Sequence, residues 1–459
     1  MPAEKSTSST QGNAIISRLS AWRARHFRDT VFGYFLASLI GICAGFFAFL
    51  LKWMIGKVTG WLTSGTGYAY DNWVFLFIPV AGIVLTGIFV RYVVRVDITH
   101  GVSKLIASLK QQIYNIKARI LVSPMIASTI TLGFGGSAGA EGPIAYTGAA
   151  IGSNLARVFG LTPQLMMIMI GCGAGAGIAG IFKSPIGGFL FTLEVLRLEL
   201  STVSVIAVLV SSILGAMTSF VLSGCTPDVV FAGSHPFDST LIPVFIALGI
   251  FCGFYSLYYS VVMKRMQKFY QRISNQWVRN IMGGIILAGA IILFPSLYGE
   301  GYDVIAKVLA TDYSSMTNGS VWTRFGDTPV LLLLVSAGII MVKCFAASAS
   351  NSAGGVAGDF APTLFAGCFA GLFFALFINH VYPEAQLPAE EFAFVGMGGV
   401  MAGAIRAPLM ALFLTVEMTG CYSLFLPVLI VCGISSGIVW LFSRRDFYAR
   451  SINIFEKFH

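Results

Sequence analysis

A single carboxylate, Glu141, stands between two charge-free stretches in the segment GGSAGAEGPIAYTG. At membrane depth a carboxylate costs about 2.5–3.5 kcal/mol on insertion scales, so it needs a partner or a function. Gly139 and Gly142 permit close approach of backbones, and Pro143 favours the first turn of a new helix. A helix that begins here presents free N–H groups and a partial positive charge, which together hold an anion.

Two interpretations of Glu141 follow from this spacing. Its own carboxylate is the anion at the helix N-terminus and leaves when another anion arrives, so that it works as a gate. Alternatively, it caps the helix and pairs with a buried Arg or Lys. The spacing by itself does not separate the two.

A second glycine-rich break, GGVAGDFAP, repeats this design, with Gly358 before Phe360 and Pro362 at the start of an apolar helix. It provides either a second set of N–H donors for the same anion or a break needed only for helix packing. Asp359 does not suit an anion site, because its carboxylate repels an anion. We expect this side chain to point away, towards a buried base.

The two breaks belong to an internal repeat. AGIFKSPIGGFLFTLE (179–194) matches AGAIRAPLMALFLTVE (402–417) at an offset of 223, and the prolines of GAEGP and GDFAP lie 219 apart. A duplication of this kind predicts two inverted halves whose broken helices meet near the membrane midplane. Four charged residues also match between the halves, and we expect them to be buried charges that either pair with one another or provide a field for anions. They are Lys183, Glu194, Arg406 and Glu417.

The composition specifies the environment of these elements. In the 459 residues, 56% are hydrophobic and 11% charged, and the mean hydropathy is +0.81. A soluble domain carries roughly 25% charged residues, so an ordinary soluble enzyme or a disordered chain is excluded. The eight Cys show no CxxC spacing, and no metal site, nucleotide loop or catalytic triad is recognisable, so we expect neither an enzyme nor a cofactor.

Charge-free runs of the length that a bilayer requires follow one another along the chain. They are 31–51, 73–90, 120–140, 158–182, 200–227, 239–263, 280–299, 360–383 and 418–443. One group of flanking segments holds 20 Lys and Arg against four acids, and it comprises 1–28, 91–119, 264–279 and 444–459. The other group holds three Lys and Arg against ten acids, and it comprises 56–72, 223–238, 296–327 and 384–391. The positive-inside rule then places both termini in the cytoplasm. The net charge of +9 therefore reflects topology, and nucleic acid is not an expected partner.

The motifs GxEGP (139–143) and GxFxP (358–362), with Tyr448 in FYARSINIF, resemble the CLC family of chloride channels and proton-coupled chloride exchangers. The likeness runs from about residue 31 to 450, and includes the intervening PIGGFLFTLEV. The resemblance implies that Glu141 is the gating glutamate and that the backbone amides of Asp359 and Phe360 form the central anion site. It also implies that the Tyr448 hydroxyl helps to close the path from inside; otherwise Tyr448 is an interfacial anchor.

Two positions depart from the family pattern. THGVS (99–103) stands where the family has GSGIP, so His100, beside Gly101, replaces the serine that contacts the anion. An imidazole N–H can donate to chloride, and protonation would make binding sensitive to pH; alternatively, His100 binds no ligand. Val195 stands where the exchangers carry an inner proton-relay glutamate. Valine carries no proton, which favours passive, channel-like conduction.

We therefore predict an all-α polytopic membrane protein, with two inverted-topology repeats whose broken, tilted helices meet at a midplane anion site. Residues 1–30 and 451–459 are short cytoplasmic tails, and 31–450 form one membrane domain with repeats at about 31–222 and 240–450. The expected function is transport of chloride or a similar monovalent anion. The alternatives are a proton-coupled chloride or fluoride antiporter and, more distantly, a cation-coupled organic-anion symporter. The resemblance implies a homodimer, and the compact chain favours a prokaryotic inner membrane and no regulatory domain.

Overall fold

The fold is described from a computed structural model that covers residues 28–64, 74–199, 201–231, 238–317, 319–325 and 328–442, with Arg23, Arg25 and His26. The predicted tails lie almost wholly outside these residues, and so does Tyr448. Within them every regular element is a helix, and the one β-bridge joins Gly139 to Gly358. Nine helices are long and apolar enough to cross a membrane in this part of the chain.

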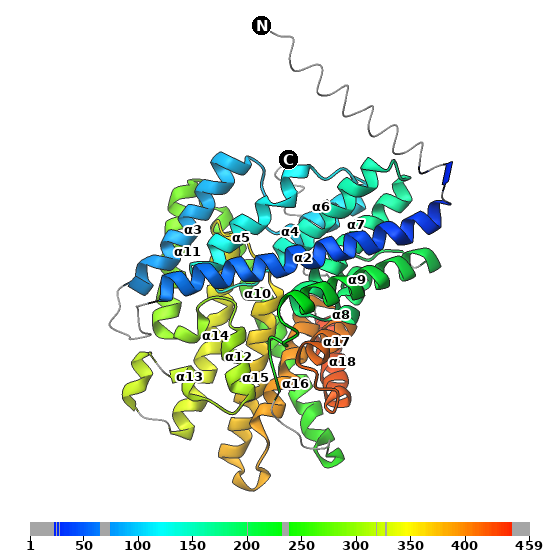
Figure 1. The fold of residues 1–459 in the computed structure, drawn as a ribbon. Helices are drawn as coiled ribbons and strands as arrows, with labels where there is room; N and C mark the ends of the chain where they lie inside the picture. The colour runs from blue at the N-terminus through cyan, green and yellow to red at the C-terminus, as the bar shows by residue number, and fades with distance from the viewer. Residues whose placement is uncertain are drawn as a thin grey trace.

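The helices of the first half end at Leu222, the predicted end of the first repeat. They are α2 (Asp29–Thr63), α3 (Val74–Ile88) with its π-helical extension η1 (Phe89–Val94), α4 (Gly101–Lys110), η2 (Ala118–Leu121), α5 (Ser123–Gly133), α6 (Glu141–Val158), α7 (Pro163–Phe182), α8 (Pro185–Leu190) with η3 (Phe191–Val195), and α9 (Thr202–Leu222). Of these, α2 runs obliquely across the molecule (Figure 1).

The helices of the second half follow in a similar order. They are η4 (Ser239–Leu241), α10 (Ile242–Gln271), α11 (Gln276–Leu293), η5 (Pro295–Leu297), α12 (Tyr302–Leu309), α13 (Ser314–Thr317), η6 (Val321–Phe325), α14 (Pro329–Ser352), α15 (Phe360–Val381), η7 (Pro383–Ala385), α16 (Ala389–Ile405), α17 (Pro408–Thr419) and α18 (Phe425–Phe442).

The same pattern of packing occurs in both halves. In the first half, α6 packs along α7, α2 along α7 and α9, and α7 along α9. In the second half, α15 packs along α16, α10 along α16 and α18, and α16 along α18. The duplication read from short motifs therefore extends to the tertiary contacts.

Glycine pairs explain the closest of these contacts. A Cβ on Gly148 would overlap the carbonyl of Gly173 where α6 meets α7, and a Cβ on Gly367 would overlap the carbonyl of Gly396 where α15 meets α16. Small residues let membrane helices approach backbone to backbone, where dispersion contacts stabilise the pair. The two halves use this device at matching places.

The helix α14 was missed by the search for charge-free runs. Lys343 interrupts the apolar stretch of α14, although its side chain has no exposed surface. The criterion failed because it assumed that a charge marks the end of a span. A lysine inside a span is instead a feature that needs an explanation.

Candidate anion site

The two glycine-rich breaks meet at the centre of the molecule. The Gly139 N–H donates to the Gly358 carbonyl at 3.1 Å, and the Gly358 N–H donates to the Gly139 carbonyl at 2.6 Å. A Cβ on Gly142 would lie 3.2 Å from the carbonyl oxygen of Ala357. Helices α6 and α15, one from each repeat, therefore begin side by side, and the glycines let their first turns approach closely.

The Glu141 carboxylate lies at this junction and is almost completely buried, with 1% of the residue exposed. One of its oxygens accepts a hydrogen bond from the Ala361 N–H, in the first turn of α15. No described Lys or Arg forms an ion pair with it. A carboxylate held by a helix N-terminus occupies the kind of place where a free anion binds.

Pro143 and Pro362 lie in the first turns of α6 and α15, and both are buried. Proline suits this position because the first turn of a helix does not use its N–H. Phe360 is 1% exposed, and its ring makes an edge contact with Phe191, with centroids 5.8 Å apart. Its backbone therefore stands at the start of α15 while its ring anchors that start to η3.

A third helix, α4, begins against the same junction. His100 precedes it in the left-handed conformation, with φ 54°. A Cβ on Gly101 would lie 3.0 Å from the carbonyl oxygen of Gly142, so the start of α4 touches the first turn of α6. The structure thus brings together His100, Gly101, Glu141 and Phe360, which lie far apart in the sequence.

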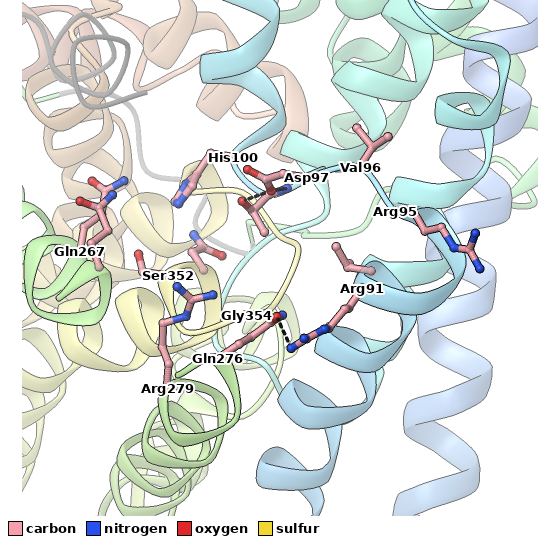
Figure 2. A pocket seen from close by; sticks show the side chains of 14 residues that line it. Arg91, Arg95, Val96, Asp97, His100, Gln267, Gln276, Arg279, Ser352 and Gly354 are labelled. Atoms are coloured by element: carbon pink, nitrogen blue, oxygen red, sulfur yellow. Dashed lines mark hydrogen bonds between the residues drawn. The ribbon is translucent and has the colours of Figure 1, made fainter. Parts of the chain in front are cut away.

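A cavity of about 520 Å³ opens beside His100 (Figure 2). Its lining comes from the ends of α3, α10, α11 and α14 and from the segment before α4. The lining residues are Val90, Arg91, Arg95, Val96, Asp97, Thr99, His100, Gln267, Gln271, Gln276, Arg279, Asn351, Ser352 and Gly354. Three arginines against one aspartate give this cavity a positive balance, which attracts anions.

Two titratable groups in the cavity have shifted pKa values. The pKa of His100 is lowered to about 4, chiefly by burial; Asp97 opposes this shift, and Lys104 adds to it. Burial by itself raises the pKa of Asp97, but attraction and hydrogen bonds from Lys104 and Thr99 outweigh it, so this pKa lies below its ordinary value. The Lys104 Nζ lies 2.6 Å from an Asp97 oxygen. His100 is therefore neutral near pH 7.

The partner of Asp359 is not a base. The Asp359 Oδ1 accepts a hydrogen bond of 2.5 Å from the amide of Asn351, which also donates to the Gly358 carbonyl at 3.3 Å. The expected buried base was wrong, because an amide at the end of α14 supplies the donor instead. Asn351 thereby connects the cavity wall to the loop before α15.

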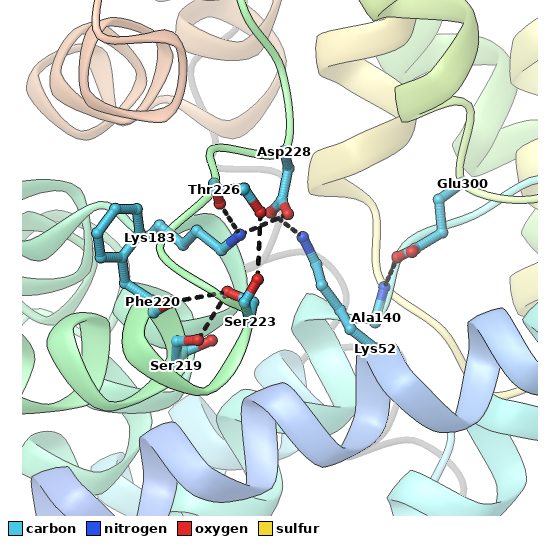
Figure 3. A network of polar contacts seen from close by, with 9 residues as sticks. All are labelled: Lys52, Ala140, Lys183, Ser219, Phe220, Ser223, Thr226, Asp228 and Glu300. Atoms are coloured by element: carbon cyan, nitrogen blue, oxygen red, sulfur yellow. Dashed lines mark hydrogen bonds and ion pairs between the residues drawn. The ribbon is translucent and has the colours of Figure 1, made fainter.

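A cluster of four charged residues lies near Ala140, the residue before Glu141 (Figure 3). Lys52 and Lys183 pair with Asp228 at 2.5 and 2.7 Å, and Glu300 accepts from the Ala140 N–H at 3.0 Å. Burial by itself raises the pKa of Asp228, but the two lysines outweigh it and hold this pKa below its ordinary value. Burial raises the pKa of Glu300. The N–H just before Glu141 is thus satisfied by another carboxylate.

The four charged residues that match between the repeats were expected to be buried, but they are only partly buried because they stand at helix ends. They are Lys183, Glu194, Arg406 and Glu417. Glu194 accepts from the N–H groups of Leu409 and Met410 at 3.2 and 2.8 Å, at the start of α17. Glu417 accepts from Ser184 Oγ at 2.5 Å and from two N–H groups at the start of α8. The pairing of Lys183 with Glu194 or Glu417 was therefore wrong, since Lys183 pairs with Asp228.

Lys183 and Arg406 are nevertheless equivalent. Both end a helix in the left-handed conformation, with φ 55° after α7 and φ 62° after α16, and a proline-initiated helix follows each. Val195 ends η3 and is 6% exposed within the hydrophobic core.

Three polar residues of this region were missed by the sequence analysis: Lys343, Asn351 and Glu300. The signal for Lys343 was a lysine within an apolar run of 24 residues. Asn351 and Glu300 gave no such signal, because their roles depend on contacts with Asp359 and Ala140.

Comparison with known proteins agrees with this geometry. The family model described as voltage gated chloride channel matches residues 82–439. A ClcB-like chloride channel protein of Ralstonia nicotianae is 28% identical over 413 residues, which cover 86% of this chain and 91% of that protein. The H(+)/Cl(-) exchange transporter ClcA of Klebsiella pneumoniae is 26% identical, over 87% of this chain and 83% of its own length.

Solved structures show the same fold. A slow cyanobacterial Cl-/H+ antiporter superposes with a TM-score of 0.77 at 21% identity, over 93% of this chain and 98% of that one. A CLC-type fluoride/proton antiporter gives a TM-score of 0.69 at 22% identity, over 89% and 95% of the two chains. The predicted all-α polytopic fold with inverted repeats is confirmed. The chain is a multi-pass membrane protein that belongs to the voltage-gated chloride channel (CLC) family of anion transporters.

Proposed function

We propose that this protein carries chloride or a similar monovalent anion across the membrane, and that Glu141 is the gate of its path. One observation carries the proposal: the Glu141 carboxylate occupies the N-terminus of α15 at the junction of the two repeats. Backbone N–H groups stabilise an anion there without a fixed ion pair. An anion that takes the place of the carboxylate would find the same donors.

The charges around the junction support a path with two entrances. The arginine-lined cavity beside His100 lies at helix ends that the positive-inside rule assigns to the cytoplasm. In the cluster of four charged residues, Asp228 and Glu300 belong to the opposite set of flanking segments, 223–238 and 296–327, and Lys52 and Lys183 reach them from α2 and the end of α7. Clefts that carry one sign of charge raise the local concentration of the opposite ion, which favours anion entry from the cytoplasmic cavity.

For the transport mode we propose passive conduction. Val195 is buried among apolar side chains and has no group that carries a proton. Proton-coupled exchange is the second candidate, and relatives named as H(+)/Cl(-) exchange transporters favour it. In this second case a group other than residue 195 must pass the proton.

One measurement separates the two modes. Purified protein in liposomes is placed under a chloride gradient, and chloride efflux and internal pH are recorded together. Efflux that depends on valinomycin, without proton movement, supports passive conduction. Uphill proton movement driven by chloride establishes exchange. No chloride flux under either condition overturns the proposal for chloride, and fluoride, nitrate and bicarbonate are then tested in the same liposomes.

Replacement of Glu141 tests the gate. Both Glu141→Gln and Glu141→Ala are expected to give an open path with faster efflux and no response to pH, because neither side chain carries the negative charge that holds Glu141 at the start of α15, and neither titrates. Wild-type rate and pH response in both variants would contradict the gate while leaving anion transport intact.

The remaining assignments belong to the same proposal. Chloride itself is the bound ligand, with no further cofactor. The protein works as a homodimer with one path in each subunit, in a bacterial inner membrane with both termini in the cytoplasm. Exposed apolar side chains on the outer helices, such as Phe35, Phe254 and Trp440, fit lipid or a second copy. Light scattering of the detergent-purified protein should give twice the chain mass of 49.2 kDa.

A further inference from the structure

Lys343 is a charged side chain in the interior of the membrane domain. It lies within α14, a predicted span, and has no exposed surface. Its Nζ donates to Ser137 Oγ at 2.8 Å and lies 4.3 Å from the centroid of the Phe365 ring. Both partners are neutral. An ammonium ion buried without a carboxylate is costly, and membrane proteins retain such a group when it has a role.

The other lysines near the path have acidic partners. Lys52 and Lys183 share Asp228, and Lys104 pairs with Asp97. Among the described residues, no carboxylate oxygen lies within the ion-pair limit of 4.0 Å from the Lys343 Nζ. The structure therefore leaves the positive charge of Lys343 without a fixed partner.

Ser137 connects Lys343 to the gate. It lies in the break before α6, four residues before Glu141, and its N–H donates to Ser350 Oγ on α14 at 2.9 Å. Phe365, the other group beside the Lys343 Nζ, lies on α15 four residues after Ala361, whose N–H donates to Glu141. The lysine thus lies beside the site that the Glu141 carboxylate occupies, and α14 holds the loop and the lysine together.

We propose that Lys343 is the fixed countercharge of the anion path. Its ammonium ion balances the Glu141 carboxylate when the gate is closed, and it balances the transported anion when the carboxylate leaves. This inference rests on the proposed function. The backbone N–H groups give the site its donors, and Lys343 gives it a full charge, which acts over several ångströms in a medium of low dielectric constant.

The test is chloride binding to detergent-purified protein, measured by calorimetry for wild type, Lys343→Met and Lys343→Arg. Methionine keeps the length of the side chain and removes its charge, and the dissociation constant for chloride is expected to rise about tenfold or more. Arginine keeps the charge, and its affinity is expected to stay within about threefold of wild type. Lys110→Met at the exposed end of α4 is the control, with the same change of net charge and an unchanged affinity.

Chloride binding is also measured for Glu141→Gln with Lys343 intact and for the double variant Glu141→Gln with Lys343→Met. If Lys343 acts on the anion itself, Lys343→Met weakens chloride binding in this background too. If the wild type and Lys343→Met bind chloride with equal affinity, the inference is overturned, whatever the thermal stability of the variants. If Lys343→Met does not fold, Lys343→Gln decides: it removes the charge and keeps a polar group towards Ser137, so weaker chloride binding supports the inference and an unchanged affinity overturns it.

Failure of the inference is distinct from failure of the proposed function. If chloride flux changes in Glu141→Gln but chloride affinity is the same in Lys343→Met as in the wild type, only the role of Lys343 as countercharge is contradicted. If the wild-type protein shows neither chloride flux nor chloride binding, both the proposed function and the role of Lys343 as countercharge are contradicted.

Discussion

Two pairs of helix N-termini, α8 with α17 and α6 with α15, occupy matching places in the two repeats, and carboxylates satisfy them in different ways. At α8 and α17 the arrangement is reciprocal: Glu417 from the second half accepts from the start of α8, and Glu194 from the first half accepts from the start of α17. At α6 and α15 it is not. Glu141 accepts from the start of α15, while the matching position of the second repeat is Phe360, which has no carboxylate, and the neighbouring Asp359 bonds to Asn351.

The two arrangements of carboxylates at helix N-termini suit different roles, one structural and one in binding an anion. A reciprocal pair stabilises both halves and leaves no N–H group free for a ligand. A one-sided arrangement leaves one carboxylate at a junction of N-termini, and a single carboxylate can leave without breaking a second contact. The asymmetry at α6 and α15 is therefore the feature that marks the candidate anion site, although both pairs contain a glutamate in a repeated motif.

Glu417→Ala should show the largest effect on stability. The carboxylate accepts from one hydroxyl and two N–H groups, and its loss leaves these donors without an acceptor. We expect the free energy of unfolding to fall by about 3 kcal/mol. Thermal unfolding in detergent measures this, with Glu417→Gln as the control that keeps part of the hydrogen bonding. Normal stability with altered chloride flux would break the comparison, because Glu417 would then belong to the path.

Glu194→Ala should destabilise the protein less, by about 2 kcal/mol, because this carboxylate accepts from two N–H groups and no hydroxyl. The same unfolding assay applies. The ratio of chloride flux to protein reconstituted should not change in this variant. A loss greater than that of Glu417→Ala would show that hydrogen-bond number does not determine the cost at these helix ends.

Glu141→Ala should change stability by less than about 1 kcal/mol in the presence of chloride, since an anion replaces the carboxylate at the start of α15. Without chloride the variant should unfold at a lower temperature than with it, and the wild-type protein should respond less. Melting curves with chloride and with gluconate measure this. An equal chloride response in both proteins would place the anion elsewhere.

His100→Asn should have the smallest effect. Burial lowers the pKa of His100 to about 4, so the imidazole is neutral from pH 5.5 to 8.5 and does not titrate in this range. The pH profile of chloride efflux should therefore be the same in the variant and the wild type, apart from a constant factor. A step near pH 6.5 that disappears in the variant would mean that the site fills with water and exposes His100 during transport.

Most of the fold and part of the site could be predicted from the sequence. Glu141, Gly139 and Gly358 were found because glycine, proline and an acid in an apolar chain are locally unusual, and the structure brings all three to one junction. Lys343 was within reach of the same reasoning, but a search for charge-free runs excluded it. The partners of Lys183, Asp359 and Ala140 were beyond reach, because they lie on distant segments.

The amino-acid sequence by itself determined the environment, the duplication and the places where helices break, since hydropathy, repeated motifs and Gly–Pro spacing are local properties of the chain. Only the tertiary structure decided which helix N-termini receive a reciprocal pair of carboxylates from across the repeat and which receive a single one. It also decided that a lysine in a span faces the loop before Glu141. These depend on which surfaces meet when the two halves pack, and acidic residues at neighbouring positions of matching motifs, Glu141 and Asp359, receive different partners there.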